Sequence, residues 1–195
     1  MQHPKPLIQR SVKSILCRPT LIGLIGLIGL GLGACASGEK VAPGPCPEIL
    51  IVADAANLTR FKPGPGRDII DVLHEDKITG FAQACEYDVD DSGAGDLIVY
   101  VAPTIVSTRG PANQTDNADF EYFVAITDAD KKILDKTRYP KVLPYVNGIP
   151  RVMWQKPEPH TYVLPLKAGQ TGASYLVYLG LQLSREELDY QRKNR

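Results

Sequence analysis

The chain has 195 residues, with 22 lysines and arginines, 22 aspartates and glutamates, and a formal net charge of zero. This charge excludes the strongly basic surface typical of nucleic-acid-binding proteins. The length suits one domain with its own hydrophobic core. Four basic residues and no acidic residue lie in residues 1–34, so the rest of the chain has 18 basic and 22 acidic residues, a net charge of −4. The 17 glycines and 16 prolines favour a turn-rich β protein over a helical bundle.

Residues 1–34 have the parts of a secretory signal peptide. Residues 1–19 are polar and basic, and residues 20–34 are a short apolar run that ends in small residues. As a helix, this run would be about 22 Å long, which is shorter than the ~30 Å hydrocarbon core of a bilayer. It therefore does not suit a permanent transmembrane helix, and we predict that residues 1–34 are cleaved.

The end of the apolar run, Leu32-Gly33-Ala34-Cys35, resembles the lipobox of bacterial lipoproteins. The resemblance implies cleavage before Cys35, a diacyl lipid on its thiol and a further acyl chain, such as palmitate, on its amino group. Two or more such chains anchor a protein stably in a membrane. Ala36, rather than an aspartate, follows the cysteine, and within this family that favours the outer membrane. The alternative is an uncleaved signal anchor with an incidental cysteine.

The four cysteines fall into two groups. Cys17 leaves with the signal peptide and Cys35 is acylated, so Cys46 and Cys85 remain. In an oxidising periplasm this pair predicts one disulfide. Two buried free thiols or a metal site are the alternatives, although no Cys-x-x-Cys spacing supports metal binding or redox catalysis. Residues 35–47 form a short tether, which reaches at most about 35 Å before Cys46.

Residues 48–195 are predicted to form one domain of successive strands. The strands we expect are residues 48–54, 79–88, 96–107, 120–127, 132–137, 151–155, 161–166 and 174–183. They are short, rich in β-branched or aromatic residues, and not separated by amphipathic helices. The pattern predicts an all-β, immunoglobulin-like antiparallel β-sandwich with a short C-terminal helix.

Two local patterns refine this fold. Leu166-x-x-Gly169 followed by Tyr175 resembles a corner of immunoglobulin-like and fibronectin type III-like sandwiches, in which a tyrosine hydroxyl hydrogen-bonds back to the corner. The alternative is that Tyr175 is an ordinary strand aromatic. Ser184 and Glu187 form a capping box that predicts a helix over residues 185–194. A helix this short is marginal alone, so it must dock on the domain or fray.

The acidic segment 88–96 is a candidate calcium site. Asp88, Asp90, Ser92 and Asp96 occupy positions 1, 3, 5 and 9 of a calcium loop. Position 12 should be a bidentate glutamate but is Val99. The same residue types are also what a β-turn requires, so an acidic hairpin loop is the alternative.

No catalytic residues and no cofactor are predicted, and we expect the protein not to be an enzyme. His74 lies in an acidic stretch and His160 follows a proline-rich loop, and we expect both at the surface or at a strand edge. The chain has no Gly-x-Ser-x-Gly nucleophile motif. The Gly-Pro segment 62–67 lacks the backbone donors of a phosphate-binding loop.

Overall, the chain is similar to small uncharacterised lipoproteins of Gram-negative bacteria, a resemblance that carries no known activity. We expect an outer-membrane-anchored, periplasm-facing lipoprotein that acts as a structural or protein-interaction module of an envelope assembly. Its expected contacts are the membrane, through the lipid on Cys35, and an envelope protein at a sheet edge or face. The alternatives are a ligand- or calcium-binding lipoprotein that uses residues 88–96, and an envelope hydrolase that uses His74 or His160.

Overall fold

The structure is a computed structural model that describes residues 44–146 and 148–194. The predicted signal peptide, the lipobox-like residues 32–35 and the predicted lipidation site Cys35 therefore lie outside the described residues. Within them the elements are, in chain order, β1 (Glu48–Ile51), η1 (Ala53–Ala55), β2 (Asn57–Phe61), η2 (Ile69–Asp71), β3 (Val72–Val89), β4 (Gly95–Arg109), β5 (Asn117–Asp128), β6 (Ile133–Pro144), β7 (Arg151–Gln155), β8 (His160–Leu166), η3 (Gly172–Ser174), β9 (Tyr175–Leu181) and α1 (Arg185–Lys193).

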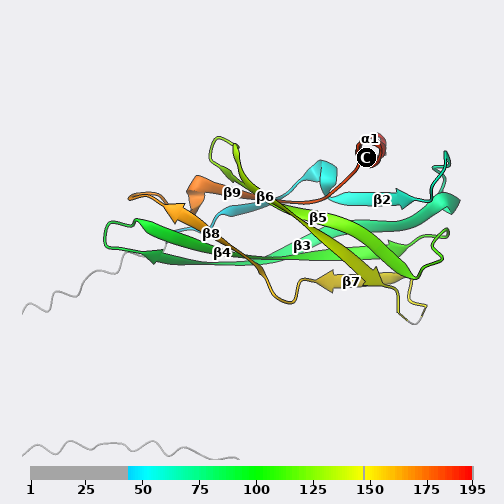
Figure 1. The fold of residues 1–195 in the computed structure, drawn as a ribbon, viewed down its shortest axis with the longest axis horizontal. Helices are drawn as coiled ribbons and strands as arrows, with labels where there is room; N and C mark the ends of the chain where they lie inside the picture. The colour runs from blue at the N-terminus through cyan, green and yellow to red at the C-terminus, as the bar shows by residue number, and fades with distance from the viewer. Residues whose placement is uncertain (1–43, 147, 195) are drawn as a thin grey trace, which may run out of the picture. The chain divides into compact units, whose positions relative to one another are not determined.

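The strands form two sheets that face each other (Figure 1). Sheet A has the order β1-β9-β5-β6, and sheet B has the order β2-β3-β4-β7, with β8 also paired to β4. β7 and β8 pair with opposite halves of β4, so together they act as one interrupted strand. The predicted all-β sandwich is confirmed, and its immunoglobulin-like character stays a prediction. One pairing departs from an antiparallel sandwich, because β1 runs parallel to β9.

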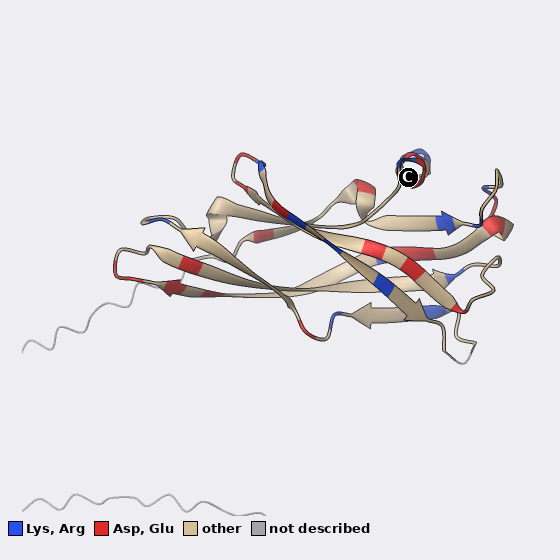
Figure 2. Ribbon diagram, in the orientation of Figure 1, with Lys and Arg blue, Asp and Glu red and all other residues tan. Residues whose placement is uncertain are grey.

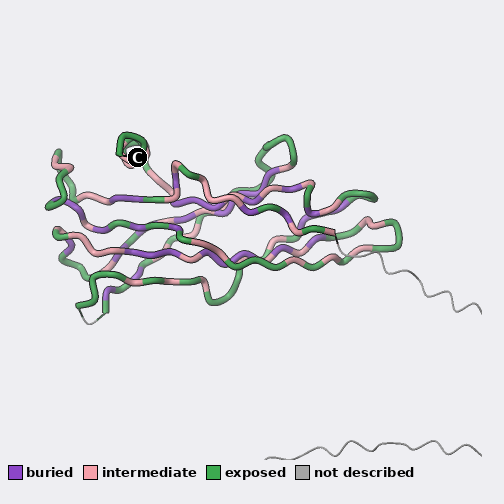
Figure 3. Tube along the Cα trace, turned by 180° about the vertical axis from the view of Figure 1, so that it is seen from behind, coloured by how far each residue is buried: buried purple, intermediate pink, exposed green. Residues whose placement is uncertain are grey.

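The hydrophobic core lies between the two sheets. Alternate side chains of the central strands point inward. Those at most 1% exposed include Leu97, Val99, Val101, Val124, Ile126, Val177 and Leu179. In Figure 3 the buried stretches run along the strands, while the hairpins and the helix are exposed. Burying an aliphatic side chain of this size contributes about 1.5–3 kcal/mol, so these alternating positions hold the sheets together.

The start of β3 is the main element that sequence periodicity missed. We predicted a strand from residue 79, whereas β3 begins at Val72. The inward-facing positions of this added segment include His74 and Asp76, which are 3% and 2% exposed. Because two of the inward side chains are polar, the alternation of apolar and polar residues that marks a strand is hidden here.

Two further strands differ from expectation. β2 has five residues and was not predicted. β6 was predicted to end at residue 137 but continues to Pro144, with Pro140 inside it. Proline is compatible with a strand at a sheet edge, where no neighbour needs its missing N–H. β6 is such an edge strand of sheet A.

The two local patterns at the C-terminal side are confirmed. The Tyr175 hydroxyl donates a hydrogen bond back to the Pro165 carbonyl at the end of β8. Ser184 caps α1, since its hydroxyl accepts from the Glu187 N–H at 3.2 Å and the Glu187 carboxylate accepts from the Ser184 N–H at 2.8 Å. The helix docks rather than frays, because the ring of Tyr190 contacts the ring of Phe61 edge-on at 4.9 Å.

Candidate functional site

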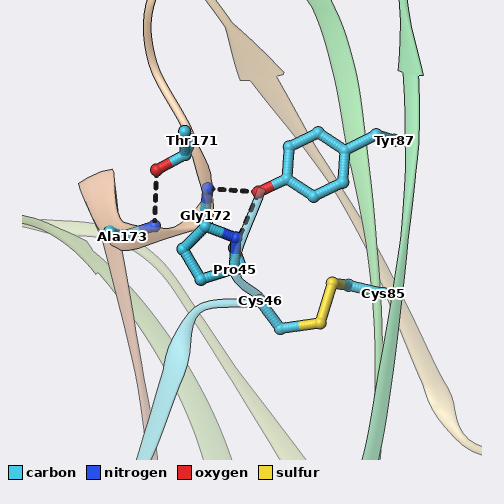
Figure 4. Close-up of a disulfide and its surroundings, with 7 residues drawn as sticks. All are labelled: Pro45, Cys46, Cys85, Tyr87, Thr171, Gly172 and Ala173. Atoms are coloured by element: carbon cyan, nitrogen blue, oxygen red, sulfur yellow. Dashed lines mark hydrogen bonds between the residues drawn. A yellow bond between two sulfur atoms is a disulfide. The ribbon is translucent and has the colours of Figure 1, made fainter. Parts of the chain in front are cut away.

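Cys46 and Cys85 form a disulfide, as predicted. Cys46 precedes β1, Cys85 lies in the second half of β3, and their Cα atoms are 5.7 Å apart (Figure 4). The bond links the start of the described chain to sheet B. It therefore holds the end of the predicted tether beside the second half of β3.

Tyr87, two residues after Cys85, strengthens the same junction (Figure 4). Its hydroxyl donates to the Pro45 carbonyl at 2.7 Å and accepts from the Gly172 N–H at 2.7 Å. A Cβ at Gly172 would lie 2.3 Å from the Pro45 carbonyl oxygen, so only glycine allows this approach. The disulfide and the tyrosine together join three segments that are distant in sequence.

The acidic segment 88–96 is the hairpin between β3 and β4. The Asp90 carboxylate accepts hydrogen bonds from the Ser92 hydroxyl at 2.6 Å and from the Ser92 N–H at 2.8 Å. These bonds from Ser92 hold the pKa of Asp90 below its usual value. Gly93 takes the left-handed conformation that a three-residue hairpin loop requires. The aspartate and serine thus serve the turn.

The other two calcium candidates, Asp88 and Asp96, are exposed partners across the strand pair. Within residues 44–146 and 148–194 no group of three or more His, Cys, Asp or Glu side chains is arranged to hold a metal ion. The four candidates are therefore neighbours in the hairpin without forming a coordination shell.

The prediction that His74 lies at the surface or at a strand edge is wrong. Its side chain points into the sandwich, and its Nδ1 lies 2.7 Å from the Asp76 carboxylate. Ser107, directly across from Asp76 on β4, is fully buried and bonds to the Tyr145 hydroxyl at 2.7 Å. A histidine, a carboxylate and a serine thus meet near one point, but burial of all three withholds them from a substrate.

His160 packs in an aromatic cluster between β6 and β8. Its Nε2 lies 2.8 Å from the Tyr122 hydroxyl, and its ring stacks on Tyr139 with centroids 3.7 Å apart. Burial, with a smaller effect from the nearby Lys156, lowers the pKa of His160 to about 4. The imidazole is therefore neutral at pH 7 and serves packing on this side of the sandwich.

Most sheet edges in the described part of the chain are blocked. β1 and β7 have four and five residues, and α1 packs along β2. In β6 and β8, prolines occupy positions whose backbone faces away from the neighbouring strand. Gln182 donates to the Glu121 carbonyl, so the backbone of Glu121 faces β9 and its partner on β6, Pro140, faces outward. Proline there removes an N–H that an added strand would need.

The second half of β3 is the exception. β2 pairs only with residues from Val72 to Lys77, so Phe81–Val89 have β4 on one side and no strand of the described chain on the other. This segment contains neither proline nor lysine nor arginine. We call Phe81–Val89 the open edge. It is nine residues long, which is enough for a further strand to pair.

The hydrogen-bonding groups of the open edge can be assigned from the ladder. Asp90 donates its N–H to the Ala94 carbonyl at 2.9 Å, which makes these two residues a hydrogen-bonded pair. Hydrogen-bonded and non-hydrogen-bonded pairs alternate along an antiparallel ladder. The N–H and C=O groups of Gln83, Cys85 and Tyr87 therefore point away from β4. Within the described residues these groups have no backbone partner, so a further strand could pair with them.

A groove of about 400 Å³ adjoins the open edge on the outer face of sheet B. Small side chains form its floor, and the loop between β7 and β8 borders it. Its lining includes Ala82, Ala84, Tyr100, Ala102, Pro157 and Pro159. Ala82 and Ala84 alternate with the edge-facing residues, so side chains of a strand added at the open edge would lie next to the groove.

Comparison with known proteins assigns no family to this chain: no family model, no curated protein and no solved structure matches it. Across residues 44–146 and 148–194 no helix has the length and hydrophobicity needed to cross a membrane. Sequence reasoning did not identify the open edge, although one signal was present. From Ile78 to Thr108 the chain has five acidic residues and no lysine or arginine.

Proposed function

We propose that this protein is a lipoprotein anchored in the outer membrane through Cys35, faces the periplasm, and acts as a protein-interaction module. The lipobox residues 32–35 support the anchor. The Cys46–Cys85 disulfide supports an oxidising compartment, where such bonds persist. The observation that carries the interaction role is the open edge, because the other edges in the described chain are short, covered or blocked by proline.

The mode of interaction is strand addition. An extended segment of the partner pairs with the free backbone groups of Gln83, Cys85 and Tyr87, which supply affinity. Its alternate side chains lie beside Ala82 and Ala84 and reach the adjoining groove, which supplies selectivity.

The charges near the open edge indicate what charge the partner segment carries. The charged side chains of the open edge are Glu86 and Asp88, and the hairpin beside it adds Asp90, Asp91 and Asp96. Figure 2 shows acidic and no basic residues on β3 and β4 near their hairpin. Complementary charge raises the association rate and disfavours wrong partners. The partner segment is therefore basic where it pairs near the hairpin, whereas Lys156 lines the groove farther along the open edge.

A proline substitution tests strand addition. Gln83→Pro removes one edge-facing N–H while leaving the ladder between β3 and β4 intact, and Gln83→Ala is the matched control. The full-length protein, carrying a photo-crosslinking residue at Ala84, is irradiated in its own membrane and its adducts are identified. We expect one reproducible protein adduct in the parent and in Gln83→Ala, and its loss in Gln83→Pro.

An adduct that survives Gln83→Pro in a variant that still unfolds cooperatively contradicts strand addition. The absence of any reproducible adduct from a properly anchored protein contradicts the interaction role. Circular dichroism of both variants establishes that the sandwich is intact.

The anchor has its own test. Metabolic labelling with an alkyne-bearing palmitate should label the parent protein and leave Cys35→Ala unlabelled. Density fractionation should place the labelled protein with outer-membrane markers. Labelling that persists in Cys35→Ala, or fractionation with the inner membrane, contradicts this part of the proposal.

A further inference from the structure

The outer face of sheet B carries a second concave region, separate from the open edge. Strand register places two parallel rows of side chains across β2, β3, β4 and β7. The first row is Asn57, Lys77, Val106 and Met153, and the second is Thr59, Glu75, Thr108 and Arg151. Paired residues in antiparallel strands project to the same face, so these rows form one surface.

Helix α1 forms a wall along this surface. The Gln191 side-chain amide donates to the Thr59 hydroxyl at 3.1 Å, which holds the helix against β2. Tyr190, Gln191 and Asn194 line the helix side, and a groove of about 480 Å³ lies between them and the two rows. This volume is in the range of small-molecule sites, about 300–1,000 Å³. We call it the helix groove.

The charges of the helix groove are unpaired, in contrast to those around it. Nearby, Arg60 bonds to Glu187 at 3.0 Å and Arg192 bonds to Asp54 at 2.9 Å. Within the described residues Glu75, Lys77 and Arg151 make no ion pair or side-chain hydrogen bond. Asp76 also lines the groove, but its carboxylate is buried on the inner side of the sheet and bonds to His74. The two unpaired cations and one unpaired carboxylate on the outer face therefore leave a net positive charge, which favours an anionic ligand.

The chemistry of the lining narrows the ligand further. The floor strands use their backbone groups in the ladders of sheet B, so the groove offers no free edge to a peptide backbone. Recognition must come from side chains, which here are mostly amides, hydroxyls, a phenol and charged groups, with Val106 as an apolar part of the floor. Such groups match a polyhydroxylated ligand rather than an acyl chain, which needs an apolar lining.

We propose that the helix groove binds a saccharide that bears a carboxylate. Arg151 and Lys77 bind the carboxylate oxygens, since a guanidinium pairs with a carboxylate through two parallel hydrogen bonds and an ammonium acts as a point charge. The amides of Asn57 and Gln191 and the hydroxyl of Thr108 bind ring hydroxyls. This inference does not depend on the partner proposed for the open edge.

Calorimetric titration of the full-length lipidated protein in detergent tests the proposal. The probes are trigalacturonate as the acidic saccharide, maltotriose as a neutral one of equal length, galacturonate as the single ring, and tri-glutamate as an acidic peptide. We expect saturable binding of trigalacturonate that weakens with salt, and little binding of maltotriose or tri-glutamate. Galacturonate distinguishes a free sugar acid from a polymer: equal affinity per ring indicates the former.

Some substitutions are expected to weaken trigalacturonate binding and another to tighten it. A general loss of structure would only weaken it, so the two explanations can be told apart. Arg151→Gln and Lys77→Gln should each weaken trigalacturonate binding about tenfold, the usual effect of losing one charge-assisted hydrogen bond. Glu75→Gln should tighten it, because it removes the only carboxylate among the unpaired charges. Lys132→Gln, in the hairpin of the other sheet, is the matched control and should change nothing.

Three results overturn the proposal. The first is absence of measurable trigalacturonate binding by the folded protein. The second is binding of maltotriose or tri-glutamate as tight as that of trigalacturonate. The third is an equal loss of binding in Lys132→Gln and Lys77→Gln, which would indicate non-specific attraction to basic groups.

Discussion

The second half of β3 and the whole of β6 are both long sheet edges. The sequence of β6 hinders pairing with an added strand, whereas that of β3 does not. β6 has prolines at Pro140 and Pro144, and both occupy positions whose backbone faces the open side of sheet A. It also carries the basic residues Lys136, Arg138 and Lys141. The open edge of β3 has neither device, and its charged side chains are acidic.

The difference shows that edge protection in this sandwich is selective. Long exposed edges are templates for pairing, and proteins usually block them with proline, charge or a covering element. Here β8 repeats the device of β6 with Pro165, and α1 covers β2. Among the described residues, the open edge of β3 is the long edge that lacks these devices, and the proposed strand addition rests on this difference.

Of the changes considered, loss of the disulfide should lower stability most, because this bond links Cys85 in the open edge covalently to Cys46. Cys46→Ser with Cys85→Ser releases a loop closed over a sequence separation of 39 residues. We expect the free energy of unfolding to fall by about 4 kcal/mol in the chain-entropy model. Urea denaturation of the double variant and the parent measures the difference. Equal midpoints would show that Tyr87 and packing alone hold this junction.

The tyrosine that anchors the protected edge β8 should contribute less. Tyr175→Phe removes the hydrogen bond to the Pro165 carbonyl and keeps the ring. We expect a loss of about 1 kcal/mol, the usual net value of one hydrogen bond. Thermal and urea unfolding measure it, and Tyr178→Phe, on the other face of β9, is the control. A loss in the control as large as in Tyr175→Phe would argue against a specific corner bond.

Opening the protected edge should change association more than stability. Pro140→Thr with Pro144→Thr restores two edge-facing N–H groups on β6. Loss of each proline lowers the free energy of unfolding of the monomer by less than about 1 kcal/mol. We expect concentration-dependent self-association, which sedimentation velocity detects. A variant that stays monomeric like the parent would show that charge alone protects β6.

The smallest effect expected is the pH dependence of stability that comes from His160. This residue begins β8 and stacks on Tyr139 of β6. Its pKa is about 4 in the folded protein, against 6.5 in the unfolded chain, because burial disfavours the charged ring. The unfolded chain therefore binds the proton more tightly. This contribution to stability is complete above pH 6.5 and is lost as pH falls from 6.5 through 4.

His160→Gln should flatten this part of the pH dependence. The measurement is the free energy of unfolding at about pH 7.5 and pH 4.5 in parent and variant, together with the NMR titration of the His160 ring. An unchanged pH slope in the variant, or a ring that titrates near 6.5, would contradict the burial of a neutral imidazole.

Sequence reasoning succeeded where one local rule applied. Alternating apolar residues identified the core strands β4, β5 and β9, and the capping box identified α1. It failed in the first half of β3, because His74 and Asp76 are bonded to each other inside the sandwich, and two polar residues at inward positions do not look like core residues in the sequence. It also shortened β6, since Pro140 looks like a strand terminator until its edge position is known.

The candidate sites show the same division. Cys46 and Cys85 could be paired from a count of cysteines, because only two remained. The open edge and the helix groove depend on which strand lies beside which and on where α1 docks. Neither can be read from neighbouring residues, since Glu75 and Arg151 are 76 positions apart in the chain but share one row of the sheet.

By itself the sequence determined the strand-rich class, the disulfide and the capped helix, because each rests on spacing within a short stretch or on residue counts. The structure decided between the two readings of Tyr175 in favour of the corner bond. Only the tertiary structure decided which edges are open, that His74 is buried, and that unpaired charges from two strands, β3 and β7, lie together beside α1. Pairing between distant strands is set by the packing of the whole core, and that information is spread over the entire chain.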